Sequence, residues 1–305
     1  NLESVGRISG RLIRRYHTLN PSLKRVQKGN DMAILITGAS AGFGAAMCRT
    51  FVAAGYHVIG AARREDKLQQ LAEELGEQFY PLEMDVSRTE SIQNALNSLP
   101  EHLSEIDCLI NNAGLALGLD SADKADFGDW ETMIQTNIIG LTFLTRQILP
   151  QMVARKQGYI INLGSIAGSY AYSGSNVYGA TKAFVRQFSM NLRAELADKN
   201  IRITNIEPGL CGDTEFSNVR FKGDDQRAAE VYENVEFIQP QDIADTALWL
   251  YQRPARMNVN SIEIMPVAQT FAGMKVYRDV PAPAKEETFE KQSMSLFGKI
   301  KSWFK

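Results

Sequence analysis

Short apolar runs alternate with amphipathic stretches along most of the chain. Short stretches rich in apolar residues, typical of strands, occur at residues 32–36, 57–62, 79–84, 107–110, 159–163, 201–206 and 261–265. Amphipathic stretches with helical spacing lie between them, among them residues 65–75, 129–152, 176–199 and 241–251. Strands that alternate with helices predict an α/β protein, in which helices cover both faces of a parallel sheet. We expect a single, doubly wound domain that spans residues 32–278.

The amino-terminal stretch departs from this pattern. Residues 1–31 carry seven Lys and Arg side chains against only Glu3 and Asp31, which is the composition of a transit peptide. Met32 stands directly before the first predicted strand, as an initiator would. We therefore favour translated upstream sequence or a cloning remnant over a working presequence, and we exclude residues 1–31 from the fold.

The carboxyl-terminal stretch, residues 279–305, combines a Pro-Ala linker with an amphipathic tail. Phe297, Trp303 and Phe304 share one apolar face, with lysines interleaved. An exposed apolar face of this kind is expected to be covered by the folded domain of the same chain, by a neighbouring subunit or by an anionic membrane surface. We favour docking on protein over a membrane, and a disordered tail is the remaining alternative.

Composition narrows the class of protein. The 305 residues are 44% hydrophobic and 22% charged with a formal net charge of -2, which describes an ordinary globular protein and gives no reason to expect nucleic acid. Cys48, Cys108 and Cys211 are too few and too scattered for a disulfide framework or a metal site. They fit a reducing compartment, so we expect a cytoplasmic protein without a metal.

A glycine-rich turn follows the first predicted strand. The sequence T-G-A-S-A-G-F-G from Thr37 to Gly44 leads directly into an amphipathic helix. Glycines at 38, 42 and 44 allow a tight turn that brings the backbone close to a pyrophosphate at the helix amino terminus. The flanking strand and helix favour a dinucleotide site over a turn that binds nothing.

The ends of the next two strands suggest which dinucleotide binds. Arg63 and Arg64 stand where an NAD site usually has an acid, and their guanidinium groups suit a 2′-phosphate. We therefore predict NADP, the alternative being that both arginines are solvated residues at a helix start. Asp85 and Val86 end the third strand, where they could hold the adenine, and Asp85 could also cap the next helix.

One Ser, one Tyr and one Lys stand at a spacing in the sequence that suits proton transfer. Ser165 follows a predicted strand, whereas Tyr178 and Lys182 are four residues apart and so share one helix face. A nearby ammonium favours phenolate, so we expect Lys182 to lower the pKa of Tyr178 while Ser165 donates to a substrate oxygen. Asn137, polar within an apolar helix, either ties helix to strand or holds a water behind Lys182.

A polar segment from Cys211 to about Glu233 indicates a mobile flap over the substrate. It contains the cations Arg220 and Lys222, and Arg220 could contact the substrate. Arg220 could equally be a solvated loop residue. The two long predicted helices, 129–152 and 176–199, offer more apolar surface than the sheet needs and predict an oligomer interface.

Together, the motifs Thr37–Gly44, Asn111–Gly114, Ser165, Tyr178-x-x-x-Lys182 and Pro208-Gly209 resemble the short-chain dehydrogenase/reductase family, over about residues 32–278. Further stretches, including 111–118, 176–188 and 214–225, look like its bacterial NADP-dependent 3-hydroxy acid dehydrogenases. The resemblance implies a Rossmann-type fold, a homotetramer, a small hydroxy-acid substrate, and catalysis by Asn137, Ser165, Tyr178 and Lys182, with substrate bound by Ser165, Tyr178 and, as we propose above, Arg220. It implies NADP binding by Gly38, Ser40, Ala41, Gly42, Phe43, Gly44, Arg63, Arg64, Asp85, Val86, Asn112, Tyr178, Lys182, Pro208, Gly209, Thr214 and Phe216.

Two other functions compete with a 3-hydroxy acid dehydrogenase. A carbonyl or 3-oxoacyl-thioester reductase would act on bulkier substrates. A cation in the flap that binds a carboxylate would favour the 3-hydroxy acid dehydrogenase, and its absence would favour the reductase. A non-catalytic protein that senses NADP would need no proton donor, so the intact Ser165, Tyr178 and Lys182 argue against it.

Overall fold

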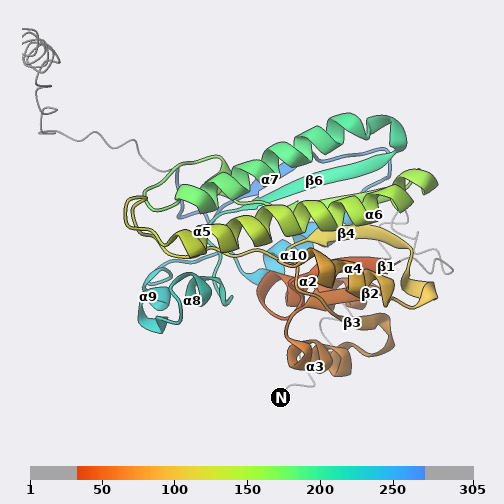
Figure 1. Cartoon of the computed structure of the whole chain (residues 1–305), viewed down its shortest axis with the longest axis horizontal. Coiled ribbons are helices and arrows are strands. Elements are labelled where there is room, and N and C mark those ends of the chain that lie inside the picture. Colours follow the sequence, from red (N-terminus) through yellow and green to blue (C-terminus); the bar gives the residue numbers. More distant parts are fainter. Residues whose placement is uncertain (1–32, 272–305) are drawn as a thin grey trace, which may run out of the picture. The chain divides into compact units, whose positions relative to one another are not determined.

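A single parallel sheet of seven strands forms the centre of the protein (Figure 1). The computed structural model describes residues 33–271. The strands are paired in the order β3-β2-β1-β4-β5-β6-β7. Their bounds are β1 Ala33–Thr37, β2 Val58–Ala62, β3 Phe79–Glu83, β4 Ile106–Asn111, β5 Gly158–Leu163, β6 Ile201–Pro208 and β7 Ser261–Ile264. The predicted Rossmann-type α/β fold is confirmed.

Helices cover both faces of the sheet because alternate strand residues point to opposite sides. Ile34 and Ile36 of β1 pack in one core cluster, whereas Ala33 and Leu35 pack in the other. The first cluster lies against α2 Gly42–Ala53, α3 Glu65–Leu75 and α10 Pro240–Tyr251. The second lies against α4 Thr89–Asn97, α6 Leu141–Arg155 and α7 Asn176–Glu195.

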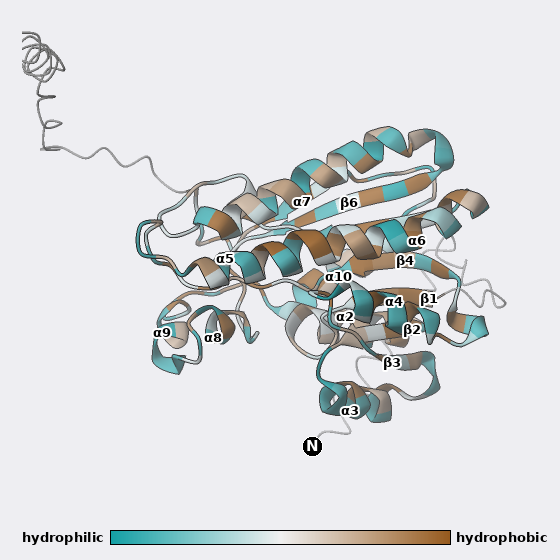
Figure 2. Ribbon diagram, viewed as in Figure 1, coloured by the Kyte–Doolittle hydropathy of each residue, from teal (hydrophilic) through white to brown (hydrophobic). Residues whose placement is uncertain are grey.

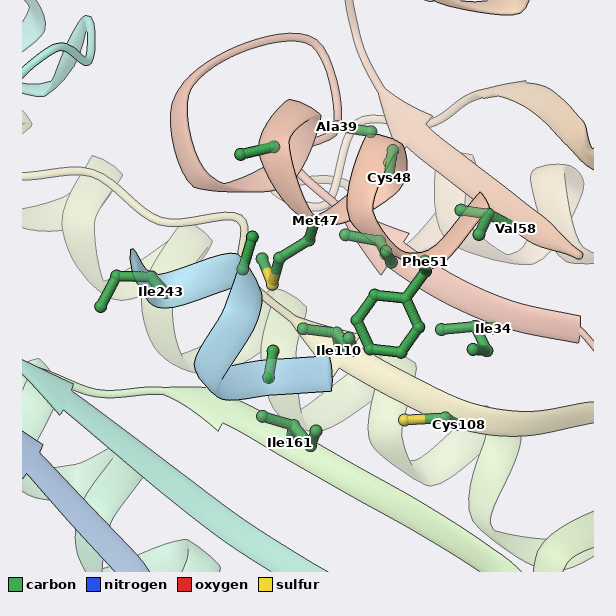
Figure 3. Close-up of a cluster of buried hydrophobic side chains, with 14 of the residues drawn as sticks. Ile34, Ala39, Met47, Cys48, Phe51, Val58, Cys108, Ile110, Ile161 and Ile243 are labelled. Atoms are coloured by element: carbon green, nitrogen blue, oxygen red, sulfur yellow. The ribbon is translucent and has the colours of Figure 1, made fainter. Parts of the chain in front are cut away.

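Close packing on the α2 face fixes the helix that follows the glycine turn. Figure 3 shows Phe51 and Met47 of α2 lying over Ile34 and Ile110, with Ile243 of α10 beside them. Phe51 and Met47 are fully buried. Brown, hydrophobic segments in Figure 2 run along the strands, while the outer helix surfaces carry more teal. Burial of these side chains therefore holds α2 firmly against the sheet, next to the glycine turn that precedes it.

The strand order reverses beside β1, and this reversal creates the ligand crevice. Leu35 of β1 is in register with Ile59 of β2 on one side and with Leu109 of β4 on the other. The connections that follow β1 and β4 leave in opposite directions, so a crevice opens at the carboxyl ends of these strands. The glycine turn and the Asn111–Gly114 turn both lie at this edge.

The long helix expected over 129–152 is interrupted, so that prediction needs correction. The chain forms α5 Phe127–Ile134, then a π-helical turn over Gln135–Gly140, and then α6. A Cβ on Gly140 would lie 2.1 Å from the carbonyl oxygen of Val86. The π-helical turn therefore packs directly against the backbone of the loop that joins β3 to α4. Apolar spacing cannot distinguish the two hydrogen-bond patterns, because one extra residue in a turn barely moves the apolar face. Turns of this kind occur frequently at functional sites.

The predicted flap forms a separate, polar layer with two short helices, α8 Phe216–Arg220 and α9 Asp225–Glu230. The predictions for residues 1–31 and 279–305 lie outside the described residues. Within residues 33–271, no helix is long and apolar enough to cross a membrane.

Candidate active site

A cleft of about 720 Å³ lies at the carboxyl edge of the sheet, between the glycine turn, the start of α7 and the flap. Every site residue predicted from the sequence lines it except Gly44 and Asn137. The structure therefore brings together side chains that are far apart in the sequence, from the turn after β1 to the flap, at one edge of the parallel sheet. Tyr172 and Glu215 also line the cleft and were not predicted.

The glycine turn is shaped for close approach of a ligand. Gly38 and Gly42 have φ angles of +68° and +49°, which residues with a side chain rarely adopt. A Cβ on Gly44 would lie 2.1 Å from the carbonyl oxygen of Gly38, so the absence of a side chain lets α2 pack against the turn. Gly44 itself does not line the cleft. Among the described residues, no side chain caps the amino end of α2. Its first N–H groups are thus available to an anion, and the turn fits a pyrophosphate.

Asn112 holds the glycine turn in place. Its side-chain Nδ2 donates to the carbonyl oxygen of Thr37 at 2.8 Å, and its backbone N–H donates to Thr37 Oγ1 at 3.0 Å. Thr37 Oγ1 also accepts from the N–H of Ala113 at 2.9 Å. These bonds join the ends of β1 and β4, so the floor of the cleft is rigid at the position where a dinucleotide would lie.

The two arginines after β2 occupy different environments. Arg63 is exposed at the edge of the cleft. Arg64 is half-buried, and its guanidinium donates to Ser40 Oγ at 3.0 and 3.2 Å. The same guanidinium forms an ion pair with Glu215 of the flap at 2.8 Å, and this carboxylate raises the pKa of Arg64 further. Both cations line the cleft, and their role toward a 2′-phosphate stays a prediction.

Asp85 forms a local turn but does not cap α4 as the sequence suggested, because the N-cap residue of α4 is Arg88 and no side chain of the described residues caps the helix there. Its Oδ1 accepts hydrogen bonds from the backbone N–H and from the Oγ of Ser87, at 3.0 and 2.7 Å. This local turn leads into α4, and Asp85 and Val86 still line the cleft. The adenine-binding role of both residues stays a prediction.

Ser165, Tyr178 and Lys182 meet in the interior of the cleft. Ser165 follows β5 and accepts a hydrogen bond from the N–H of Ala167 at 3.1 Å, which fixes its side chain. Tyr178 and Lys182, one turn apart on α7, are each only 7% exposed. Lys182 Nζ donates to the carbonyl oxygen of Leu163 at 2.8 Å. A hydroxyl, a phenol and an amine thus line the same part of the cleft, with the phenol and the amine almost fully buried.

Burial dominates the ionisation of both titratable groups. Burial raises the pKa of Tyr178 to about 12, and the Ser165 hydroxyl and the charge of Arg220 partly oppose this rise. Burial lowers the pKa of Lys182 to about 8. The sequence predicted that Lys182 would bring the pKa of Tyr178 down. The structure shows the opposite net direction, because removal of the phenol from water outweighs the nearby charges.

Asn137 lies behind this group, within the π-helical turn. Its side chain accepts from the N–H of Leu115 at 2.9 Å and donates to the carbonyl oxygen of the same residue at 2.8 Å. It also donates to Thr181 Oγ1 at 3.1 Å, next to Lys182 in the chain. Asn137 therefore ties its helix to the loop after β4 and to α7, instead of to a strand as predicted, whereas a water path behind Lys182 stays a prediction.

The flap brings Arg220 next to Tyr178. The Arg220 guanidinium carbon lies 5.6 Å from the centre of the Tyr178 ring, and its Nη2 donates to the hydroxyl of Tyr172 at 3.2 Å. Its Nε donates to the carbonyl oxygen of Gly118 at 3.2 Å. Arg220 is therefore an oriented residue of the cleft. Lys222, the other cation considered, instead pairs with Asp129 at 2.9 Å and does not line the cleft.

This fold and this site define the class of the protein. Residues 32–225 match the family model described as short chain dehydrogenase. That match covers more than half of the chain, and the chain belongs to the short-chain dehydrogenase/reductase family.

Curated relatives and solved structures narrow the comparison. A protein of Haemophilus influenzae named as a probable NADP-dependent dehydrogenase is 60% identical over 245 residues, which cover 80% of this chain and 97% of the relative. An NADP-dependent 3-hydroxy acid dehydrogenase of Shigella flexneri is 53% identical over 247 residues, which cover 81% of this chain and all of the relative. A serine dehydrogenase solved in its closed form with NADP+ is 52% identical with a TM-score of 0.80, and the match covers 81% of this chain and 100% of that one. The predicted enzyme class and cofactor are confirmed.

Proposed function

We propose that the protein interconverts small 3-hydroxy acids, such as serine, L-allo-threonine or 3-hydroxypropionate, and their 3-oxo acids with NADP. The observation that carries this proposal is the position of Arg220, whose guanidinium lies beside the ring of Tyr178 inside the cleft. The names of the similar proteins, which include 3-hydroxy acid and serine dehydrogenases, support it.

The cleft suits NADP along its whole length. The glycine turn would hold the pyrophosphate, Arg63 and Arg64 the 2′-phosphate, and Asp85 with Val86 the adenine. The loop from Pro208 to Phe216 would cover the nicotinamide. When bound, the nicotinamide accepts a hydride from the substrate carbon or returns one to it.

The side chains at the interior end of the cleft would handle the proton. In oxidation, Tyr178 Oη takes the proton of the substrate hydroxyl, and in reduction it gives the proton back. Ser165 Oγ donates to the substrate oxygen and so holds it next to Tyr178. Lys182 would place its ammonium group 5.9 Å from the centre of the Tyr178 ring. Asn137 would hold the neighbouring part of α7 in place through its hydrogen bond to Thr181.

Arg220 would select the substrate. A 3-hydroxy acid carries its carboxylate two bonds from the reacting carbon, so a cation next to Tyr178 is within reach of that group. Tyr172 and the carbonyl oxygen of Gly118 orient the guanidinium, which reduces the entropy lost when it forms a fork with a carboxylate. An uncharged alcohol would leave this cation with its two neutral partners, Gly118 and Tyr172, and no carboxylate.

A reductase of bulkier carbonyl compounds is the second candidate. Tyr170, Tyr172, Val231 and Tyr232 also line the cleft, and their side chains would accommodate an apolar substituent. A protein that only senses NADP is less consistent with a buried phenol and amine held one turn apart. The predicted cytoplasmic location and homotetramer remain predictions.

A substrate panel tests the proposal. The purified full chain is supplied with NADP+ or NAD+ and with serine, L-allo-threonine, 3-hydroxypropionate or an uncharged alcohol, and the absorbance of the reduced nicotinamide is followed. Simple ketones and a 3-oxoacyl thioester are tested with the reduced cofactors. We expect the 3-hydroxy acids with NADP+ to give the highest kcat/KM. A preference for uncharged ketones or thioesters would contradict the proposal and favour the second candidate.

A further inference from the structure

An ion pair connects the cofactor end of the cleft to the flap. Glu215 stands immediately before α8, 151 residues after Arg64 in the sequence. Arg64 Nη1 donates to Glu215 Oε1 at 3.0 Å, and Nη2 lies 2.8 Å from Oε2. The remaining side of the guanidinium, Nε and Nη2, donates to Ser40 Oγ. A continuous chain of contacts therefore runs from the glycine turn through Arg64 to the flap.

This geometry places the forked, terminal end of the Arg64 guanidinium on Glu215. Both terminal nitrogens contact the carboxylate, so a phosphate that binds Arg64 in the same forked manner has to displace Glu215. A phosphate monoester carries a charge of about -1.5 to -2 at neutral pH, and it would also repel the carboxylate. Glu215 and a 2′-phosphate are therefore rivals for one cation.

We propose that Glu215 determines cofactor preference by competing with the 2′-phosphate for Arg64, and that binding of this phosphate releases the amino end of α8. The proposal rests on the proposed function, since it takes the cofactor to be NADP. NAD, which lacks the phosphate, leaves the Arg64–Glu215 pair intact.

The pair is weak enough to be displaced. The side chains of Arg64 and Glu215 are 41% and 54% exposed, and exposed pairs of this kind contribute little to stability. A doubly charged phosphate that gains both Arg64 and the neighbouring Arg63 is the stronger partner. The carboxylate thus reduces the preference for NADP without abolishing it.

Release of Glu215 would be transmitted to the reacting groups. Glu215 is followed by Phe216, whose ring centre lies 5.8 Å from that of Tyr178. The far end of α8 stays attached, because the N–H of Gly118 donates to the carbonyl oxygen of Arg220 at 2.9 Å. Lys222 adds an ion pair to Asp129 at the same end. The flap would therefore pivot about this end, with Phe216 moving most.

Cofactor binding provides the first test. Dissociation constants of NADP+ and NAD+ are measured by calorimetry on the full chain for the wild type, Glu215→Gln and Glu230→Gln. Glu230, on α9 of the same flap, is exposed and interacts with Gln226, so it controls for loss of a flap charge. We expect Glu215→Gln to tighten NADP+ binding by about two- to fivefold, the range set by exposed ion pairs, and to leave NAD+ unchanged. Glu230→Gln should alter neither.

Several results would overturn the inference. Equal changes for NADP+ and NAD+ in Glu215→Gln would assign Glu215 to folding of the flap, and weaker NADP+ binding would make it a supporter of Arg64. Either result leaves the proposed function standing. If the wild type failed to bind NADP+, the proposed function and the inference would both fail.

Hydrogen exchange of the flap provides the second test. Exchange in residues 211–221 is compared with adenosine 2′,5′-bisphosphate and with adenosine 5′-monophosphate bound at saturation. We expect faster exchange only with the 2′-phosphate, and in Glu215→Gln we expect fast exchange with either nucleotide. Equal protection of the wild-type flap by both nucleotides would contradict release of α8.

Discussion

Lys182 Nζ lies 5.9 Å from the centre of the Tyr178 ring and donates its hydrogen bond to the backbone of Leu163. Both side chains are buried, and burial moves their pKa values in opposite directions, that of Tyr178 up to about 12 and that of Lys182 down to about 8. Both groups are thereby held closer to their neutral forms than in water. If Tyr178 acts as proposed, its phenol would need a further source of charge in the cleft to offset this burial.

The buried amine makes folding stability depend on pH. Because burial lowers the pKa of Lys182 from 10.5 to about 8, the folded protein releases this proton before the unfolded chain does. Between these values the unfolded chain binds more protons, so stability rises with pH. Compared with Lys182→Met, the free energy of unfolding of the wild type should increase by about 2 kcal/mol between about pH 7 and 9.5.

Urea unfolding of both proteins at each pH measures this difference. The range stops below pH 10 because Tyr178 acts with the opposite sign there: its raised pKa gives stability that is lost as pH rises from about 10 toward 12. A difference between wild type and Lys182→Met that does not change with pH would show that the amine is not desolvated.

Cofactor discrimination should depend on the two arginines after β2. Arg63→Ala combined with Arg64→Ala removes the charge-assisted bonds to a 2′-phosphate, each of which contributes about 1.5–3 kcal/mol. We expect NADP+ binding to weaken by more than about tenfold while NAD+ binding stays nearly constant. Lys67→Ala, an exposed cation on α3, is the control for net charge. Equal losses for both cofactors would mean that the arginines only support the fold.

Substrate charge should matter through Arg220. In Arg220→Ala, the KM for serine should rise by about tenfold or more, since a charged hydrogen bond is lost, while kinetics with an uncharged alcohol change little. Lys222→Ala is a matched control, because Lys222 belongs to the same flap but pairs with Asp129 outside the cleft. A proportional loss for charged and uncharged substrates would assign Arg220 to flap folding through Gly118 and Tyr172.

The third glycine of the turn should be sensitive to a single methyl group. In Gly44→Ala, the added Cβ would lie 2.1 Å from a backbone oxygen, so α2 would have to shift. We expect destabilisation of about 1–3 kcal/mol, measured by urea unfolding, together with weaker cofactor binding. Gly128→Ala in α5 is the control, because its Cβ would meet only the side chain of Asp126, at 3.3 Å. Equal stability of the two variants would show that the turn tolerates a larger separation from α2.

The sequence predicts the sheet well because most of its strands are short runs rich in apolar residues, and the others alternate apolar with polar residues, as β7 Ser261–Ile264 does. The predicted strand at 159–163 is β5 Gly158–Leu163, and that at 201–206 is the first part of β6 Ile201–Pro208. The turns at the carboxyl ends of the strands carry most of the predicted cofactor residues and Ser165, and parallel topology brings these to one edge, where α7 adds Tyr178 and Lys182. Fold and site therefore follow from the same pattern.

Three features could not be predicted in this way. The π-helical turn over Gln135–Gly140 leaves the apolar spacing almost unchanged, so the pattern is also that of an ordinary helix. The direction of the Tyr178 pKa shift depends on the degree of burial, which residue types do not reveal. The contact between Arg64 and Glu215 joins residues 151 positions apart, and no local motif marks it.

The turnover of Tyr178→Phe on a 3-hydroxy acid with NADP+ tests the central claim most directly. Loss of the hydroxyl removes the only atom through which Tyr178 can pass a proton, whereas the ring keeps its packing against Phe216. We predict that kcat falls by about 10²–10⁴-fold while the dissociation constant of NADP+, measured in parallel, stays within about twofold of the wild type. Near-normal turnover in Tyr178→Phe would contradict the assignment of this cleft as the place where the hydroxy acid reacts.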